Sequence, residues 1–375
     1  MNINESAPSG INRLFWVDNL RTVIIFLVVL YHVGGVYESA GLWAEFWIVD
    51  DPSTIVWVGI VGIMFDIFVM PTMFFISGFL VVTSLQNKTD WGFIKGKLRR
   101  LMVPWVIAVF TLIPIYKFIF LYSRNLPQEH WSNYFHFANQ NSQNWLWFLP
   151  VLFLFNMIFL LLRKARLRFP NINIKMALLI ASFIGIAYSF YIGGVLGFRT
   201  WTHTPFLDFE NERLLLYFLT FLLGAMCFRQ GLFAEKPKTK LLYNVINSIA
   251  WIPITAHIFA RLYPFFYYEG FSVTPLYRIL WWVSFYLSLV CLMYLMIESF
   301  RRYLNKSGSM WERLNKSSYG VYIIHVIMIG VFGTLLLNLA IPAEIKYPLL
   351  ILSTYLVSNF AVWAYHTILF KIKTK

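Results

Sequence analysis

The first long apolar segment of the chain carries two ionisable side chains, Arg21 and His32. His32 follows Arg21 by eleven positions, which in an α-helix correspond to three turns plus about 20°. Both side chains therefore project from one helix face, about 16 Å apart along the axis. Such a helix places a guanidinium at a membrane edge and an imidazole about half-way across. Ionisable groups are costly inside a bilayer, and by default they mark a functional pathway facing protein or water. We therefore expect chemistry on this face.

Another histidine of interest lies late in the chain, at the end of the segment Ser318–His325. A helix that begins near Ser318 places His325 about 10 Å into the membrane, at a depth similar to that of His32. The two imidazoles can then meet. The alternative is that His325 only makes an interhelical hydrogen bond that stabilises packing.

The second apolar segment, residues 54–85, contains Pro71 and then Phe74-Phe-Ile-Ser-Gly-Phe79. Proline removes a backbone donor and glycine permits close helix approach, so we expect a kink and a tight helix crossing here. Packing alone explains such small residues as well as chemistry does.

A basic stretch lies directly before the third predicted span and contains Lys97, Arg99 and Arg100. Most clusters of this kind are topological anchors. Lys97 and Arg100 also share a helix face, and together with Arg21 at the same membrane edge they could clamp phosphate groups. The spacing leaves both interpretations open.

These residues must be positioned by membrane-spanning helices. The chain has 375 residues, of which 59% are hydrophobic and 13% charged, its mean hydropathy is +0.64, and its apolar runs repeatedly reach the roughly 20 residues that cross a bilayer. We predict an all-α, polytopic integral membrane protein: one bundle and one domain over residues 1–375. The ten predicted spans cover residues 20–38, 56–85, 101–122, 145–162, 176–197, 213–230, 241–262, 276–299, 318–338 and 347–370.

The basic residues collect in alternate connections, which explains the net charge of +14 by topology. Residues 39–55 contain no Lys or Arg, and residues 123–144 contain only Arg124. The positive-inside rule then places both termini in the cytoplasm, with anionic lipid as the partner of the surplus charge and no role for nucleic acid. The even-numbered connections hold Lys95, Lys97, Arg99 and Arg100; Arg163, Lys164, Arg166 and Arg168; Arg229, Lys236, Lys238 and Lys240; and Arg301, Arg302, Lys306, Arg313 and Lys316.

Several other site types find no support in the sequence. There is no phosphate-binding glycine loop, no dinucleotide fingerprint and no Cys/His metal spacing, so no metal site is expected. The two cysteines, Cys227 and Cys291, each lie inside a predicted span. Tryptophans near predicted span ends fit interfacial belts better than a sugar-stacking platform; they are Trp43, Trp47, Trp57, Trp105, Trp145, Trp147 and Trp201.

Four segments, in order along nearly the whole chain, resemble the membrane acyltransferase 3 family. Arg21, ten residues and then His32 resemble its Arg/Lys, ten residues, His signature, and Phe74–Phe79 resembles its Phe-Phe-x-Ser-Gly-Tyr/Phe segment. Lys97–Arg100 is similar to its Arg-x-x-Arg element, and Tyr319–His325 to its late Tyr-Gly-x-Tyr-Leu-x-His segment. The Asp18-Asn-Leu-Arg21 start also looks similar to the branch that includes periplasmic glucan succinyltransferases.

Two positions depart from that pattern. Lys97 replaces the first arginine of Arg-x-x-Arg, which keeps the charge but loses the bidentate fork. Trp145 stands where the family often has a histidine, so the role of that histidine does not transfer to this chain.

The resemblance implies a membrane-bound O-acyltransferase of the cell (plasma or inner) membrane. Its donor would be cytoplasmic acyl-CoA, usually acetyl-CoA and alternatively succinyl-CoA, and its acceptor a hydroxyl of an extracytoplasmic or cell-surface glycan. His32 would meet the thioester, either as general base on the acceptor hydroxyl or as the nucleophile that carries the acyl group.

The same resemblance suggests roles for the other candidates. Asp18 would orient Arg21, Ser77 would donate a hydrogen bond near the developing oxyanion, and His325 would complete the catalytic set. The donor phosphates would be held by Arg21, Lys97, Arg99 and Arg100.

Two other classes of function fit ten spans with polar groups at mid-membrane. One is an exporter of a glycan or a lipid-linked sugar, although the sequence has no inverted repeat and no paired broken helices. The other is a membrane scaffold without activity, which leaves the expected convergence of Arg21, His32, Lys97 and Arg100 on one membrane face unexplained.

Overall fold

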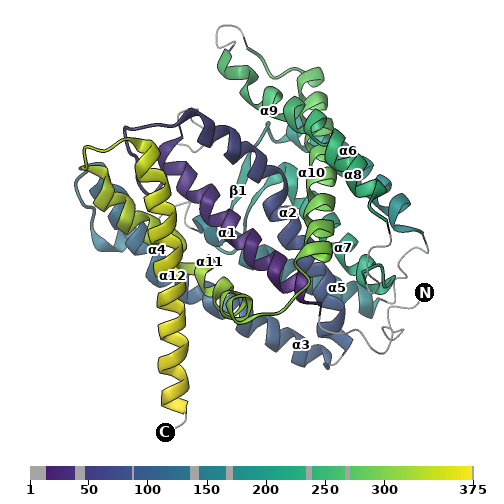
Figure 1. Ribbon diagram of the computed structural model, residues 1–375, viewed down its shortest axis with the longest axis horizontal. Helices are drawn as coiled ribbons and strands as arrows, with labels where there is room; N and C mark the ends of the chain where they lie inside the picture. Colours follow the sequence, from purple (N-terminus) through teal and green to yellow (C-terminus); the bar gives the residue numbers. More distant parts are fainter. Residues whose placement is uncertain are drawn as a thin grey trace. The chain divides into compact units, whose positions relative to one another are not determined.

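The computed structural model describes residues 14–38, 47–86, 88–135, 143–165, 172–233, 239–266 and 271–373. Helices dominate these residues (Figure 1), so the all-α class expected from the sequence is confirmed. The helices are α1 (Phe15–Tyr37), α2 (Val56–Gln86), α3 (Asp90–Lys97), α4 (Val103–Ser123), α5 (Phe148–Lys164), α6 (Ile174–Val195), α7 (Leu214–Arg229), α8 (Leu241–Ile249), α9 (Trp251–Phe266), α10 (Pro275–Tyr303), α11 (Ser309–Leu337) and α12 (Ala343–Lys373).

Short elements connect some of these helices. A π-helical turn, η1 (Leu98–Met102), joins α3 to α4. The 3-10 turns that follow in the described part of the chain are η2 (Trp131–Tyr134), η4 (Asn144–Trp147) and η5 (Asn211–Arg213). The strands β1 (Trp201–His203) and β2 (Asp208–Glu210) pair antiparallel, with Trp201 opposite Glu210. The sequence reasoning did not predict this hairpin.

Ten helical segments among the described residues are long and apolar enough to cross a membrane, which agrees with the predicted number. One boundary differs clearly. The third segment begins at Asp90, about three turns before the predicted start at residue 101, because α3 and η1 extend α4 without a break. The basic stretch therefore lies within this helical segment and not before it.

The chain divides into two compact units, and the boundaries between them fall inside or beside helices. Unit 1 comprises Met1–Val17, Ile67–Val106 and Leu146–Asn305, and unit 2 comprises Asp18–Asp66, Ile107–Trp145 and Lys306–Lys375. Each unit thus combines segments that are distant in the sequence. The single domain expected from the sequence stays a prediction.

Side-chain caps explain where several helices of unit 1 begin. Thr89 accepts a hydrogen bond from the Gly92 N–H at the start of α3, and Asn173 does the same for Met176 at the start of α6. Thr274 caps α10, and the next residue, Pro275, needs no N–H partner at the first helical position. These residues satisfy donors that a helix start leaves without an intrahelical acceptor.

The core of unit 1 depends on a close crossing of α2 and α7. A Cβ atom on Gly78 would lie 1.8 Å from the carbonyl oxygen of Phe221, and one on Gly224 would lie 2.1 Å from that of Phe75. Only glycine allows the two backbones to come this close. The tight crossing expected at this segment is confirmed, and α2 continues as a helix through Pro71.

In unit 2, α11 packs against α12, which crosses it in Figure 1. Ser317 donates a hydrogen bond to Asn359 Oδ1, at a distance of 2.5 Å. A Cβ atom on Gly320 would lie 2.6 Å from Val362 Cγ2, so this glycine also serves a close helix contact.

Candidate active site

His32 and His325 meet side chain to side chain within unit 2. His32 Nδ1 lies 2.9 Å from His325 Nε2, and the ring centroids are 5.0 Å apart. His325 has no exposed surface, whereas His32 is half-buried. The expected meeting of the two imidazoles is present, although 293 positions separate them in the sequence.

The hydrogen bond made by the other nitrogen of His325, Nδ1, determines the tautomers of both histidines. His325 Nδ1 lies 2.7 Å from the carbonyl oxygen of Tyr322, and because a carbonyl only accepts, Nδ1 is the protonated nitrogen. In the neutral ring Nε2 is then an acceptor, so His32 Nδ1 donates to it. This tautomer puts the lone pair of His32 on Nε2, as a general base or a nucleophile requires.

Polar contacts near the start of both helices set the register that brings the histidines together. Thr22 Oγ1 donates to Asn315 Oδ1 at 2.5 Å, and this pair is also 293 positions apart. Asn315 Nδ2 in turn donates to Asn19 Oδ1 at 2.9 Å. From these contacts both helices advance ten residues, or about 15 Å, to reach the histidines. Residues of α1 and α11 therefore match at a constant offset, which means that the two helices run parallel.

Arg21 lies in the first turns of α1, three helical turns before His32. Its Nη2 atom forms an ion pair with Asp18 Oδ1 at 3.3 Å, and both side chains are partly exposed. The pairing expected from their spacing is present. A partly exposed guanidinium whose direction is fixed in this way is suited to an anion.

The cations Lys97, Arg99 and Arg100 lie in unit 1, where α3 ends and η1 begins. Lys97 interacts electrostatically with Arg100 and with Lys88, and a Cβ atom on Gly96 would lie 3.6 Å from the Lys88 ammonium. Arg99 and Arg100 are exposed. Lys97, Arg99 and Arg100 thus lie around one helix end, and Lys88 is a fourth cation beside them. Lys88 was not among the residues predicted from the sequence.

The π-helical turn has a local cause that the sequence reasoning missed. Pro104 has no N–H, so the carbonyl of Arg100 cannot accept the usual α-helical bond from it. The Val103 N–H instead donates to the carbonyl of Leu98, five residues earlier. Turns of this type are rare and are frequently found at functional sites.

Ser77 lies in the part of α2 that belongs to unit 1 and is half-buried beside Gly78. Phe74, in the same sequence segment, has a packing role. The centroid of its ring lies 4.8 Å from that of Phe148 and 4.9 Å from that of Tyr217. The oxyanion role of Ser77 stays a prediction.

Comparison with known families agrees with this arrangement. A family model described as an acyltransferase domain, that of acyltransferase family 3, matches residues 14–367. The chain belongs to acyltransferase family 3. It is accordingly an acyltransferase, and its ten candidate spans make it a multi-pass membrane protein. Searches of curated proteins and of solved structures give no significant match. The resemblance to the glucan-succinylating branch stays a prediction.

In this member of acyltransferase family 3, Trp145 supports the helix that carries His325. Its indole Nε1 donates to the carbonyl oxygen of Ile323 at 2.9 Å, and its own carbonyl accepts from the Tyr322 hydroxyl at 2.5 Å. The interfacial-belt interpretation was wrong for Trp145, which is 3% exposed. The one sign of a site role for Trp145 in the sequence was its position, where the resemblance to the family leads one to expect a histidine.

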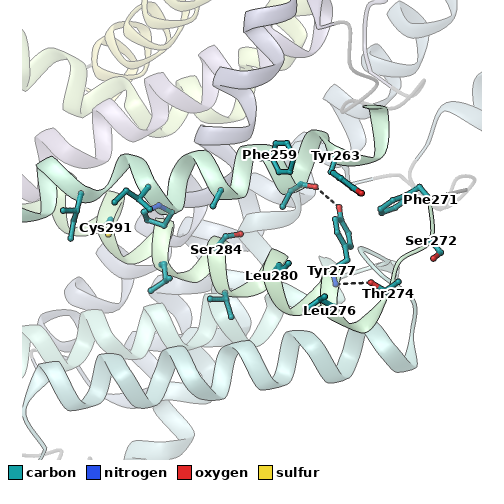
Figure 2. Close-up of a pocket in the computed structure, with 17 residues that line it drawn as sticks. Phe259, Tyr263, Phe271, Ser272, Thr274, Leu276, Tyr277, Leu280, Ser284 and Cys291 are labelled. Atoms are coloured by element: carbon teal, nitrogen blue, oxygen red, sulfur yellow. Dashed lines mark hydrogen bonds between the residues drawn. The ribbon is translucent and has the colours of Figure 1, made fainter. Parts of the chain in front are cut away.

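A large cavity in unit 1 is separate from these residues. It has a volume of about 940 Å³ and lies between α9 and α10 (Figure 2). Its lining is mostly apolar, with Tyr277 donating a hydrogen bond to the carbonyl of Ala260 at 2.9 Å. None of the predicted site residues lines it. Among the described residues, no group of His, Cys, Asp and Glu has the arrangement of a metal site.

Proposed function

We propose that the protein is an O-acyltransferase of the cell (plasma or inner) membrane. It transfers an acyl group, acetyl in the first instance and succinyl in the second, from cytoplasmic acyl-CoA to a hydroxyl of an extracytoplasmic or cell-surface glycan. The observation that carries this proposal is the hydrogen-bonded His32–His325 pair, whose tautomer leaves a basic nitrogen on His32. A glucan is the first acceptor to test, because of the similarity to glucan succinyltransferases.

The proposed chemical step uses His32 as a general base. Its Nε2 takes the proton of the acceptor hydroxyl as the hydroxyl oxygen attacks the thioester carbonyl. The carbon–sulfur bond then breaks, and the departing thiolate of coenzyme A receives that proton. Throughout, the Nδ1–H of His32 keeps its hydrogen bond to His325 Nε2, which holds the ring in the reactive tautomer, as the aspartate of a Ser-His-Asp triad does. A covalent acyl adduct on His32, detected by mass spectrometry, would instead assign the nucleophilic route.

The phosphate groups of the donor need cations. Arg21 with its partner Asp18 in unit 2, and Lys97, Arg99 and Arg100 in unit 1, are each candidates on their own account, and each group is tested separately. Guanidinium and ammonium groups make charge-assisted hydrogen bonds to phosphate, and arginine can do so with two bonds at once.

The decisive experiment compares His32→Ala with the unaltered protein in membrane vesicles. Transfer of label from acetyl-CoA or succinyl-CoA to the glycan fraction should fall by about 10²- to 10⁴-fold, because a positioned base contributes roughly that factor. Binding of the donor should be retained. Mass spectrometry of surface glycans identifies the acyl group by the mass that it adds.

Donor binding is tested with cation variants. Arg21→Ala should weaken the affinity for acetyl-CoA by about tenfold, the value of one hydrogen bond to a charged group. Lys306→Ala removes an exposed cation of the same unit and should leave affinity unchanged. Lys97→Ala and Arg100→Ala are compared in the same way with Lys95→Ala, an exposed cation of α3. Normal acylation by the His32 variant refutes the catalytic assignment, and glycan export without acylation favours a transporter.

A further inference from the structure

The side chain of Trp47 lies flat against the imidazole of His32. The two rings are nearly parallel, with an interplanar angle of 11° and centroids 5.1 Å apart. The Trp47 side chain is 2% exposed, so the interfacial-belt interpretation was wrong for this residue as well. Both residues belong to unit 2.

Trp47 opens a short stretch that is buried although it has no regular secondary structure. Ile48 and Val49 are almost fully buried, and the Ile48 carbonyl accepts a hydrogen bond from Ser123 Oγ in α4. A backbone segment so placed is held by its surroundings, because buried polar groups of the main chain need partners.

An ion pair fixes the other end of this stretch. Asp51 Oδ2 lies 2.9 Å from Lys346 Nζ in α12, and each side chain is about 98% buried. Asp51 Oδ1 also accepts from the Ser53 N–H, and Lys346 donates to the carbonyl of Leu337. With its charges paired and its hydrogen bonds satisfied, the pair anchors the stretch to α12.

The helix that carries His325 leaves room for the same stretch. A Cβ atom on Gly330 would lie 2.5 Å from Ile48 Cδ1, so the absence of a side chain at this position lets Ile48 pack directly on α11. Contacts with α4, α11 and α12 therefore determine where Trp47 meets α1.

We propose that Trp47 is a positioning residue for the acyl transfer proposed above, on which this inference rests. Hydrogen bonds to His325 and to the backbone of Val28 hold the edge of the His32 ring. The indole contacts its face and so fixes the plane of the ring. The face of an indole also favours the imidazolium that forms when His32 takes a proton.

A role in packing alone makes a different prediction. If Trp47 only fills space, an aliphatic side chain should replace it about as well as a smaller aromatic ring. If the ring plane matters, phenylalanine should preserve function better than leucine, because only an aromatic side chain offers a flat surface to the imidazole.

The test compares Trp47→Leu and Trp47→Phe with Trp57→Leu. The control is Trp57, a half-exposed tryptophan that lies in the same unit and contacts the Tyr347 ring. For Trp47→Leu we expect acyl-transfer turnover to fall by about 10- to 100-fold, because small errors in placement at a reacting centre cost factors of this size. The affinity for acetyl-CoA should stay unchanged. Trp47→Phe should remain within about fivefold of the unaltered protein, and Trp57→Leu should keep its full rate.

A second variant tests the anchor without touching Trp47. Asp51→Asn combined with Lys346→Met removes both charges together and so avoids leaving one charge buried alone. Turnover should fall, again with unchanged affinity for acetyl-CoA, in protein that is monodisperse in detergent.

Three results would overturn the inference: full turnover in Trp47→Leu, equal losses in the leucine and phenylalanine variants, or an equal loss in Trp57→Leu. The His32→Ala protein is measured in parallel. If it transfers acyl groups normally, the proposed function fails, whereas an inactive His32→Ala with an active Trp47→Leu refutes the positioning role alone.

Discussion

At the scale of single residues, the backbone carbonyl of Tyr322 controls a histidine on another helix. It accepts from His325 Nδ1, and the consequence passes through His325 Nε2 to His32 Nδ1. In hydrolases with a Ser-His-Asp triad, a carboxylate holds the imidazole in the correct tautomer. Here a neutral imidazole does so, which avoids placing an additional charge in the membrane.

The tautomer argument predicts a graded effect at position 325. His325→Ala removes the imidazole that accepts from His32 Nδ1 and leaves the backbone of Val28 as a partner of the His32 ring. Acyl-transfer turnover should fall by about 10²- to 10⁴-fold, as it does when a triad loses its orienting group. His325→Gln can present a side-chain oxygen near the position of Nε2, so it should recover at least about tenfold over the alanine variant. Initial rates of label transfer at saturating acetyl-CoA measure both. Equal rates for the two variants contradict the assignment.

At the scale of elements, the pairing of α1 with α11 places the two histidines of the proposed catalytic site. Thr22–Asn315 and His32–His325 share one sequence offset, so the polar contacts near the helix starts and the histidine contact belong to the same parallel packing. Since both helices rise by the same amount per residue, a register fixed at one level is kept three turns later. Trp145 adds a support at Ile323, two residues before His325.

The crossing of α2 and α7 gives a prediction about stability. Gly78→Ala forces a methyl group against the backbone of Phe221, which should lower the free energy of unfolding by about 1–3 kcal/mol. Gly62→Ala in the same helix is the control, since its Cβ atom would lie 3.9 Å from the nearest atom, in the Tyr31 ring. Thermal unfolding of the detergent-purified proteins gives the comparison. A Gly78→Ala protein as stable as Gly62→Ala would argue against a close crossing.

At the scale of the whole molecule, the uneven distribution of charge predicts how the chain crosses the membrane. The even-numbered connections carry most of the basic residues, and basic connections are retained in the cytoplasm. This predicted orientation puts the basic connections on the cytoplasmic side, from which the proposed acyl-CoA donor would come.

Cysteine labelling tests this orientation. In a background with Cys227 and Cys291 replaced by alanine, Ser132→Cys in η2 should react with a membrane-impermeant maleimide added to intact cells. Ser307→Cys should react only after the cells are opened. Both serines are exposed. Labelling of Ser307→Cys in intact cells would reverse the predicted topology.

The sequence by itself determined what depends on neighbouring residues. Ten spans followed from apolar runs, because hydrocarbon excludes polar residues over a fixed length of helix. The spacing of Asp18, Arg21 and His32 on one helix followed from its period, and glycine at position 78 indicated a close crossing. The predicted start of the third span was wrong, because the helical segment begins earlier and includes the basic stretch at η1.

Only the tertiary structure decided which distant residues are in contact. Helix geometry put His32 and His325 at a similar depth, but packing alone brings their rings together and stacks Trp47 on His32. Burial of a tryptophan or pairing of two histidines depends on contacts between helices, and hydropathy summed along the chain carries no information about such contacts. The same holds for the Asp51–Lys346 pair, whose partners are 295 positions apart. Local physics determined the helices of this protein, and packing between them decided which side chains come into contact.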